Sequence, residues 1–248
     1  MTALEGRTAL VTGGASGIGA ACARELAARG AVVTVADLDD VGAKTVAEEI
    51  GGKPWAVDLS EVGSLEQLQL ETDILVNNAG IQHVSPIVDF PPDRFRLIQT
   101  LMVEAPFLLI RAALPYMYES GFGRIINISS IHGLRASEYK VAYVTAKHAL
   151  EGLSKVTALE GGPRGVTSNC VNPGYVRTPL VTKQITDQAR SHDMPEQEVV
   201  EEILLKESAI KRLLEPEEVA ALVSWLASAD SAMVTGASYT MDGGWSAR

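Results

Sequence analysis

Two residues four positions apart, Tyr143 and Lys147, are the pair in this sequence best suited to acid–base chemistry. They stand in AYVTAKHAL (142–150), where most other residues are small or apolar. In a helix their side chains share one face, because residues at i and i+4 are neighbours. A nearby ammonium favours the ionised form of a phenol, whose pKa is ordinarily about 10. The pair could therefore accept a proton near neutral pH; the alternative is an ordinary surface pair on a helix.

Ser130 is a third polar residue in a position to act on a substrate. It ends a predicted apolar strand, GRIINISS (123–130), and ligands of parallel sheets bind at the carboxyl ends of strands. Its hydroxyl could hydrogen-bond an alcohol oxygen and hold it beside the phenol. Oxidation of an alcohol needs a base for the proton and a nicotinamide for the hydride. We therefore predict Ser130, Tyr143 and Lys147 as catalytic residues.

The glycine-rich stretch TGGASGIG (12–19) lies between the first predicted strand and the first predicted helix. Gly13, Gly17 and Gly19 would let the backbone approach a pyrophosphate, and the N–H groups of the helix N-terminus would face the anion. A tight turn alone could account for the glycines. Their place between a strand and a helix favours dinucleotide binding instead.

Asp37 stands near the end of the second predicted strand. A carboxylate there can accept hydrogen bonds from ribose hydroxyls and would repel a 2′-phosphate, so it favours NAD over NADP. The alternative is that Asp37 only caps the helix that follows it.

The chain that must position these residues alternates apolar strands with helices. Strands are predicted at 7–13, 31–37, 53–60, 73–80, 123–130, 165–174 and 238–244, and helices at 17–30, 39–50, 92–119 and 140–160. This alternation predicts a single α/β domain over residues 1–248: a Rossmann-like, doubly wound parallel sheet in three layers. The polar segment 178–212 interrupts the alternation and is predicted to form a mobile, lid-like excursion.

Composition limits the kinds of binding partner and the cellular compartment that we expect for this protein. The 248 residues carry a net charge of −10, which argues against nucleic acid and anionic membranes as partners. Cys22 and Cys170 lie in apolar contexts, as expected of reduced thiols. No apolar run stands out as a membrane span, and no charged segment followed by a long apolar one begins the chain. We predict a cytoplasmic protein without a metal.

The motifs named so far, with NNAG (77–80) and NPGYVRTP (172–179), resemble those of the short-chain dehydrogenase/reductase family over essentially the whole chain. The resemblance implies NAD as cofactor and a homotetramer. The cofactor-binding residues that it implies or supports are Gly13, Ser16, Gly17, Ile18, Gly19, Asp37, Asp58, Asn78, Gly80, Tyr143, Lys147, Pro173, Val176 and Thr178.

Longer stretches, including NNAGIQHVSPIVDFP (77–91) and HGLRAS (132–137), are similar to one group within that family, the D-3-hydroxybutyrate dehydrogenases. This likeness implies a small anionic hydroxy-acid substrate held by Gln82, His132, Lys140 and Gln184 together with Ser130 and Tyr143. Tyr175 and Trp245 could form the wall around its aliphatic part. The expected reaction interconverts a short 3-hydroxy acid and its 3-oxo acid, with (R)-3-hydroxybutyrate and acetoacetate as the best candidates.

Two departures from the family pattern bear on this expectation. Met102 stands where the family usually has an asparagine that holds a water of a proton relay, and a thioether is only a weak acceptor. The path from Asp58 to Asp73 is also short, and predicts a tight crossover with a helix of about 10 residues. Two rivals stay open: a related enzyme of a polyol, sugar or acyl thioester, and a nucleotide-binding protein of weak activity.

Overall fold

A parallel sheet of seven strands forms the centre of the molecule. The structure is a computed structural model that describes residues 3–247, apart from the side chains at 180, 183, 184, 187, 188, 191 and 192. The strand order is β3-β2-β1-β4-β5-β6-β7. The strands are β1 (Thr8–Thr12), β2 (Val32–Asp37), β3 (Lys53–Ala56), β4 (Ile74–Asn77), β5 (Gly123–Ile128), β6 (Val166–Pro173) and β7 (Ser238–Met241). The order reverses between β1 and β4, where open α/β sheets form a ligand crevice.

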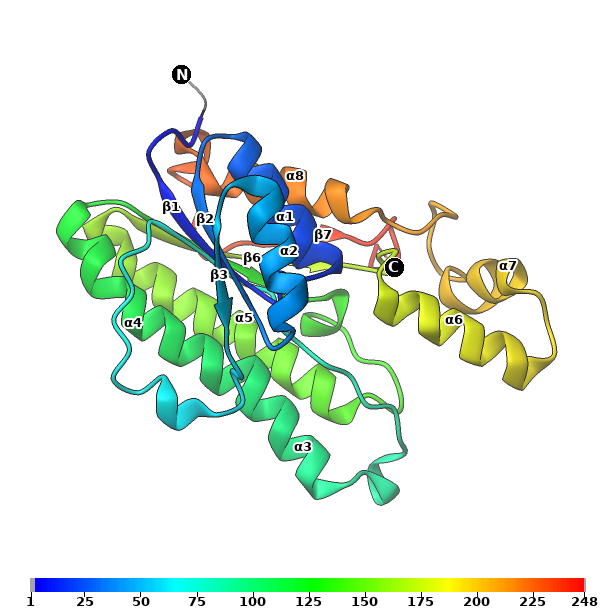
Figure 1. Ribbon diagram of the computed structural model, residues 1–248. Coiled ribbons are helices and arrows are strands. Elements are labelled where there is room, and N and C mark those ends of the chain that lie inside the picture. The colour runs from blue at the N-terminus through cyan, green and yellow to red at the C-terminus, as the bar shows by residue number, and fades with distance from the viewer. Residues whose placement is uncertain (1–2, 248) are drawn as a thin grey trace.

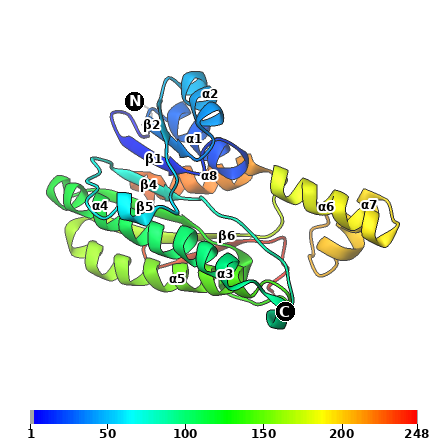
Figure 2. The ribbon, with the colours of Figure 1, turned by 60° about the horizontal axis from the view of Figure 1, so that its bottom comes forward.

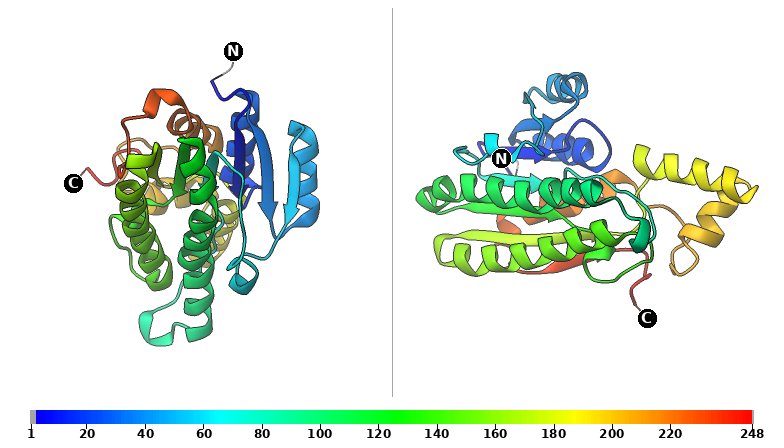
Figure 3. Two further views of the ribbon diagram at one scale, coloured as in Figure 1. Left: turned by 90° about the vertical axis from the view of Figure 1, so that its left-hand side faces the viewer. Right: turned by 90° about the horizontal axis from the view of Figure 1, so that it is seen from below.

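Helices cover both faces of this sheet, which confirms the predicted three-layer α/β fold (Figures 1 and 3). One face carries α1 (Gly17–Ala28), α2 (Asp40–Ile50) and α8 (Pro216–Ala227), and the other carries α3 (Pro92–Gln99), α4 (Ala105–Ser120) and α5 (Val141–Gly161). Strands β1, β4, β5 and β6 are buried on both faces, as their apolar sequences predict. The sequence analysis did not predict α8, which packs against α1.

The predicted helix at 92–119 forms as α3 and α4 joined by a π-helical turn, Thr100–Glu104. By length and composition alone, Pro92–Ser120 could cross a membrane, so the expectation that no such run exists is wrong. Leu109, Ala113 and Met117 of α4 are buried in the core beside β4 and β5. The apolar side of this helix is thus used in packing against the sheet.

The crossover between β3 and β4 differs from the prediction. Instead of a helix of about 10 residues, it holds a single 3₁₀ turn, Val62–Ser64, followed by irregular chain. Leu65 is buried against α4, and Leu70 N–H donates to the carbonyl of Ala112. These anchors let a short, irregular segment cover the edge of the apolar layer without a helix.

The segment predicted as an excursion projects from the body of the molecule (Figures 1 and 2). It contains α6 (Pro179–His192), α7 (Glu196–Glu198) and a π-helical turn, Val199–Leu204. The sequence of this segment is mostly polar, yet the segment encloses a small apolar core of its own. The buried members of that core are Ile185, Val199, Leu204, Leu205 and Leu213.

Candidate active site

The glycine-rich turn between β1 and α1 is shaped by close backbone contacts. A Cβ atom on Gly19 would lie 2.0 Å from the carbonyl oxygen of Gly13, and one on Gly13 would lie 2.8 Å from Asn78 Nδ2. Asn78 Nδ2 donates to the carbonyls of Thr12 (2.9 Å) and Gly13 (3.1 Å), which ties β4 to the turn. Ser16 precedes α1 and makes no capping hydrogen bond. The first turn of α1 therefore presents its N–H groups, with the hydroxyl of Ser16, to an anion, which fits a pyrophosphate.

Asp37 and Asp39 have separate tasks at the end of β2. Asp39 caps α2 by accepting a hydrogen bond from Gly42 N–H at 3.1 Å. Asp37 instead accepts from Ala15 N–H at 3.0 Å, so it faces the glycine-rich turn. The alternative in which Asp37 only caps the helix is therefore wrong.

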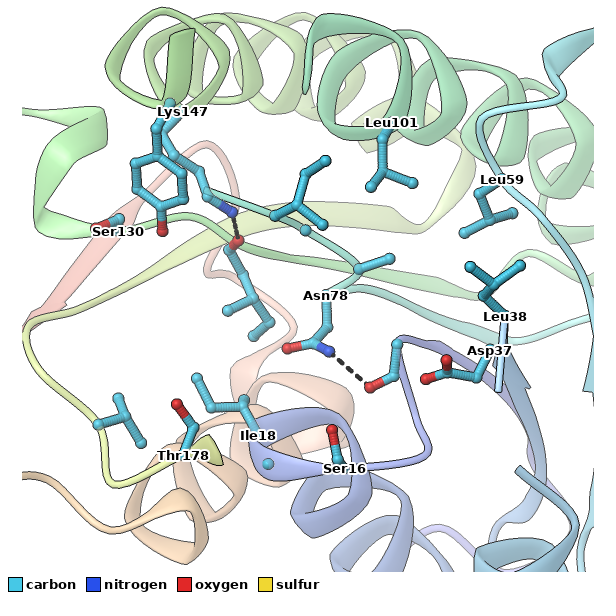
Figure 4. Close-up of a pocket in the computed structure, with 18 of the residues that line it drawn as sticks. Ser16, Ile18, Asp37, Leu38, Leu59, Asn78, Leu101, Ser130, Lys147 and Thr178 are labelled. Carbon is cyan, nitrogen blue, oxygen red and sulfur yellow. Dashed lines mark hydrogen bonds between the residues drawn. The ribbon is translucent and has the colours of Figure 1, made fainter. Parts of the chain in front are cut away.

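One cleft of about 700 Å³ joins these parts to the end of β5. In Figure 4, Asp37 lies at one end of the cleft, Ser130 and Lys147 at the other, and Asn78 between them. Every predicted cofactor-binding residue lines this cleft except Gly19, which is buried behind it. The predicted lining residues are Gly13, Ser16, Gly17, Ile18, Asp37, Asp58, Asn78, Gly80, Tyr143, Lys147, Pro173, Val176 and Thr178.

The cleft also has apolar walls that the sequence analysis missed. Leu38 and Leu59 line the end near Asp37, and Leu97 and Leu101 face them from α3 and the π-helical turn. Such walls suit a flat ring such as adenine. The spacing of Leu97 and Leu101, four residues apart on one helical face, is the signal that could have identified them.

Ser130, Tyr143 and Lys147 meet at the opposite end of the cleft. Ser130 Oγ accepts from His132 N–H at 3.1 Å, which fixes the oxygen and leaves the hydroxyl proton available to a ligand. Lys147 is buried and donates from Nζ to the carbonyl of Ile128 at 2.6 Å. Its Nζ lies 5.5 Å from the centre of the Tyr143 ring. The helix thus presents phenol and ammonium side by side, as their spacing predicts.

Burial governs the acidity of both groups in the free protein. It raises the pKa of Tyr143, whereas a hydrogen bond with the Ser130 hydroxyl lowers that pKa. It also lowers the pKa of Lys147 to about 8, against the attraction of Cys170 and Glu151. The ammonium of Lys147 was expected, together with an oxidised nicotinamide ring, to favour the phenolate; in the free protein the pKa of Tyr143 is instead raised. Burial outweighs an ammonium that lies beside the ring and is engaged by a carbonyl.

Four of the predicted substrate-binding residues gather beside Tyr143. Lys140 Nζ lies 3.3 Å from His132 Nε2 and 5.6 Å from the centre of the Tyr175 ring. The His132 ring makes edge-to-face contacts with Trp245 and with Tyr143, at centroid distances of 6.2 and 6.3 Å. The result is an aromatic cluster around one buried ammonium; these four residues lie beside the cleft and are not among those that line it.

Desolvation and then the neighbouring Lys140 lower the pKa of His132 to about 4, so the imidazole is neutral at physiological pH. Burial also lowers the pKa of Lys140. With Nε2 facing an ammonium, the neutral ring carries its proton on Nδ1, which has no partner among the described residues. The buried ammonium of Lys140 is therefore the charged group here, and an anionic ligand group would complement it.

Three other predicted positions are placed less directly. Gln82 is half-buried on the loop after β4 and makes no hydrogen bond to His132 or Lys140 in the described part of the chain. The side chain of Gln184 lies outside the described residues. Asp58 is exposed at the cleft, and hydrogen bonds from Ser60 lower its pKa.

Met102 is 1% exposed and lies in the π-helical turn, packed with Ile98, Ala142 and Ala146 near Tyr143. Its Sδ would lie 3.5 Å from a Cβ on Gly80. The position expected to hold a relay water is thus filled by apolar atoms.

Comparison with known proteins agrees with this geometry. Residues 13–246 match the family described as enoyl-(acyl carrier protein) reductase. A D-beta-hydroxybutyrate dehydrogenase of Rhizobium meliloti is 44% identical over 98% of this chain and 99% of its own. A solved short chain dehydrogenase/reductase family protein is 35% identical, with a TM-score of 0.88 over 99% of this chain and all of its own. A solved putative gluconate 5-dehydrogenase of Beutenbergia cavernae with bound NADP is 34% identical, with a TM-score of 0.86 over all of this chain and 99% of its own.

Proposed function

Since this chain belongs to the short-chain dehydrogenase/reductase family, we propose that it interconverts a short 3-hydroxy acid and its 3-oxo acid with a nicotinamide cofactor. (R)-3-hydroxybutyrate and acetoacetate are the proposed pair, as the relative from Rhizobium meliloti is named for this activity. The observation that carries the proposal is the buried ammonium of Lys140, set among aromatic rings one helical turn from Tyr143. A carboxylate bound there would hold C3 of the acid near the phenol.

Tyr143 acts as the base in this proposal. The Ser130 hydroxyl donates to the alcohol oxygen, and Tyr143 takes the alcohol proton while Lys147 holds a positive charge beside it. A nicotinamide cofactor held along the cleft would supply the hydride acceptor, and its oxidised ring would add a second positive charge that favours the phenolate. In the opposite direction Tyr143 returns the proton to the substrate oxygen.

We propose NAD as the physiological cofactor. Asp37 is free of helix capping and faces the turn, where it would accept from ribose hydroxyls and repel a 2′-phosphate. A similar solved protein contains NADP, so the preference of this chain for NAD over NADP needs a direct test. Asp37→Asn should raise kcat/KM with NADP relative to NAD by about tenfold, since removal of one repulsive charge is worth roughly 1–2 kcal/mol. An unchanged ratio would remove Asp37 from cofactor selection.

The substrate is identified with a panel of 3-hydroxy acids, neutral polyols and sugars, and acyl thioesters. The rate of oxidation of each compound is measured from the absorbance of NADH. The wild type should oxidise (R)-3-hydroxybutyrate best. Lys140→Ala should raise its KM about 10- to 100-fold, because a charge-assisted contact to the carboxylate is lost, and should leave the KM for NAD unchanged. Equal oxidation of polyols by both proteins would show that the carboxylate pocket plays no part.

The rival without useful catalysis is tested by a single turnover. Enzyme in excess over (R)-3-hydroxybutyrate, at saturating NAD, should produce a burst of NADH. No burst with any member of the panel would favour a nucleotide-binding role. We also propose a cytoplasmic location, which the two buried thiols support, and a homotetramer, which the family resemblance implies. Light scattering measures the assembly.

A further inference from the structure

A buried carboxylate, Glu151, lies one helical turn beyond Lys147 on α5. Glu151 is 4% exposed, yet it forms no ion pair among the described side chains. Its Oε1 accepts from Asn172 Nδ2 at 2.5 Å, and its Oε2 accepts from Ser238 Oγ at 2.6 Å. Burial of an unpaired charge is costly, so a carboxylate retained here calls for a physical reason.

Glu151 is linked to the catalytic residues in two ways: through helix α5 and through a hydrogen bond with Asn172. Asn172 Nδ2, which donates to Glu151, also donates to the carbonyl of Ser130 at 2.9 Å. Glu151 therefore connects α5, which carries Tyr143 and Lys147, to the ends of β6 and β7 and to the backbone of Ser130.

The charge of Glu151 complements that of Lys147. No described carboxylate lies within ion-pair distance of Lys147, whose Nζ donates to a neutral carbonyl. The titratable groups that bear on Lys147 are Tyr143 and Glu151 from α5 and Cys170 from β6. Burial and then Glu151 raise the pKa of the Cys170 thiol, so that group stays neutral. Among the described carboxylates, Glu151 is therefore the one whose charge bears on the buried ammonium.

We propose that Glu151 is a positioning residue of the reaction, a buried counter-charge that keeps Lys147 protonated while its hydrogen bonds hold α5 against β6 and β7. The role rests on the proposed functions of Tyr143 and Lys147. Removal of the negative charge would strengthen the net effect of burial and would move the pKa of Lys147 below about 8. The phenolate would then lose its ammonium neighbour at a lower pH.

The test is a titration of Lys147 in the full-length free protein by NMR of ¹³C-labelled lysine side chains, with Lys147→Ala used to assign the signal. Glu151→Gln keeps the size of the side chain and removes its charge. We expect the midpoint of Lys147 to fall by about one pH unit, a tenfold change in its ionisation equilibrium. The alkaline limb of the kcat/KM profile should move in the same direction.

Ser238→Ala is the matched control, because it removes a hydrogen bond from the same carboxylate and keeps its charge. It should lower kcat without moving the midpoint. An unmoved midpoint in Glu151→Gln, or an equal movement in Ser238→Ala, overturns the proposal. If Glu151→Gln does not fold, Glu151→Asp decides: the midpoint should stay near that of the wild type, and a full-unit fall overturns the proposal. The titration needs no substrate, so failure of the proposed activity would be seen separately.

Discussion

The two ends of the cleft are built in different ways. At the cofactor end the shape of the backbone dominates: Gly19 lies against Gly13, and the N–H groups of the first turn of α1 face the cleft. At the catalytic end buried side chains dominate, and their pKa values are displaced by desolvation, as for Lys147 and His132. Cofactor binding therefore depends on the steric fit of the backbone. Proton transfer depends on which buried side chains stay charged in the interior of the protein.

The largest effect should come from the catalytic end. Tyr143→Phe removes the proposed base, so kcat for hydroxy-acid oxidation should fall about 10³-fold, while the affinity for NADH, measured by fluorescence, should stay within a factor of two. Tyr175→Phe is the control, because it removes a neighbouring phenol hydroxyl and should keep kcat within a few-fold. Retained activity in Tyr143→Phe would break the division between the two ends.

A second effect tests the cofactor end. Gly19→Ala places a Cβ 2.0 Å from the Gly13 carbonyl and 2.6 Å from Asn78 Nδ2, so the turn must shift and NADH should bind at least tenfold more weakly. Gly152→Ala in α5 meets no atom within 4 Å. That control should leave NADH binding unchanged and stabilise the protein by roughly 0.5–1 kcal/mol, the helix preference of alanine over glycine. Equal binding in both variants would contradict the steric argument.

The pH dependence of the substrate KM separates the contributions of His132 and Lys140. His132, with a pKa of about 4, is neutral from weakly acidic pH upward, so it should cause no change in KM near neutrality. Lys140, whose pKa is lowered by burial, loses its charge as the pH rises. The KM for the hydroxy acid should therefore rise on the alkaline side, about tenfold per pH unit above that pKa. In Lys140→Ala the KM should be high and independent of pH; the same alkaline rise there would assign it to another group.

The smallest effect concerns Met102, whose thioether fills the place of a relay water. Met102→Asn should raise kcat by a few-fold by restoring a polar group near Lys147. It should also lower the free energy of unfolding by about 1–3 kcal/mol, because an amide replaces buried apolar atoms. Stopped-flow kinetics and urea denaturation measure the two quantities. An unchanged or lower kcat would show that another group already relays the proton.

The sequence predicted the backbone-built features better than the buried charges. Glycine spacing and continuous apolar runs identified the turn, the sheet and the layers, because each reflects local geometry. Helix α8 was missed although Glu215 and Glu218 form a capping box before an apolar run. The displaced pKa of Tyr143 and the contact of Glu151 with Asn172 could not be predicted. Both depend on burial and on residues brought together from distant parts of the chain.

The excursion is tied to the body where it leaves and rejoins it, and again where the N–H groups of Ala209 and Ile210 donate to the carbonyl of Gly243. Val176 pairs with Leu214, Arg177 N–H donates to the Leu214 carbonyl at 2.8 Å, and Arg177 Nε lies 2.9 Å from a carboxylate oxygen of Glu215. A segment with its own core and few ties to the body behaves as an exchangeable unit. Its sequence can diverge, or be replaced by that of a relative, without altering the sheet or the reacting groups.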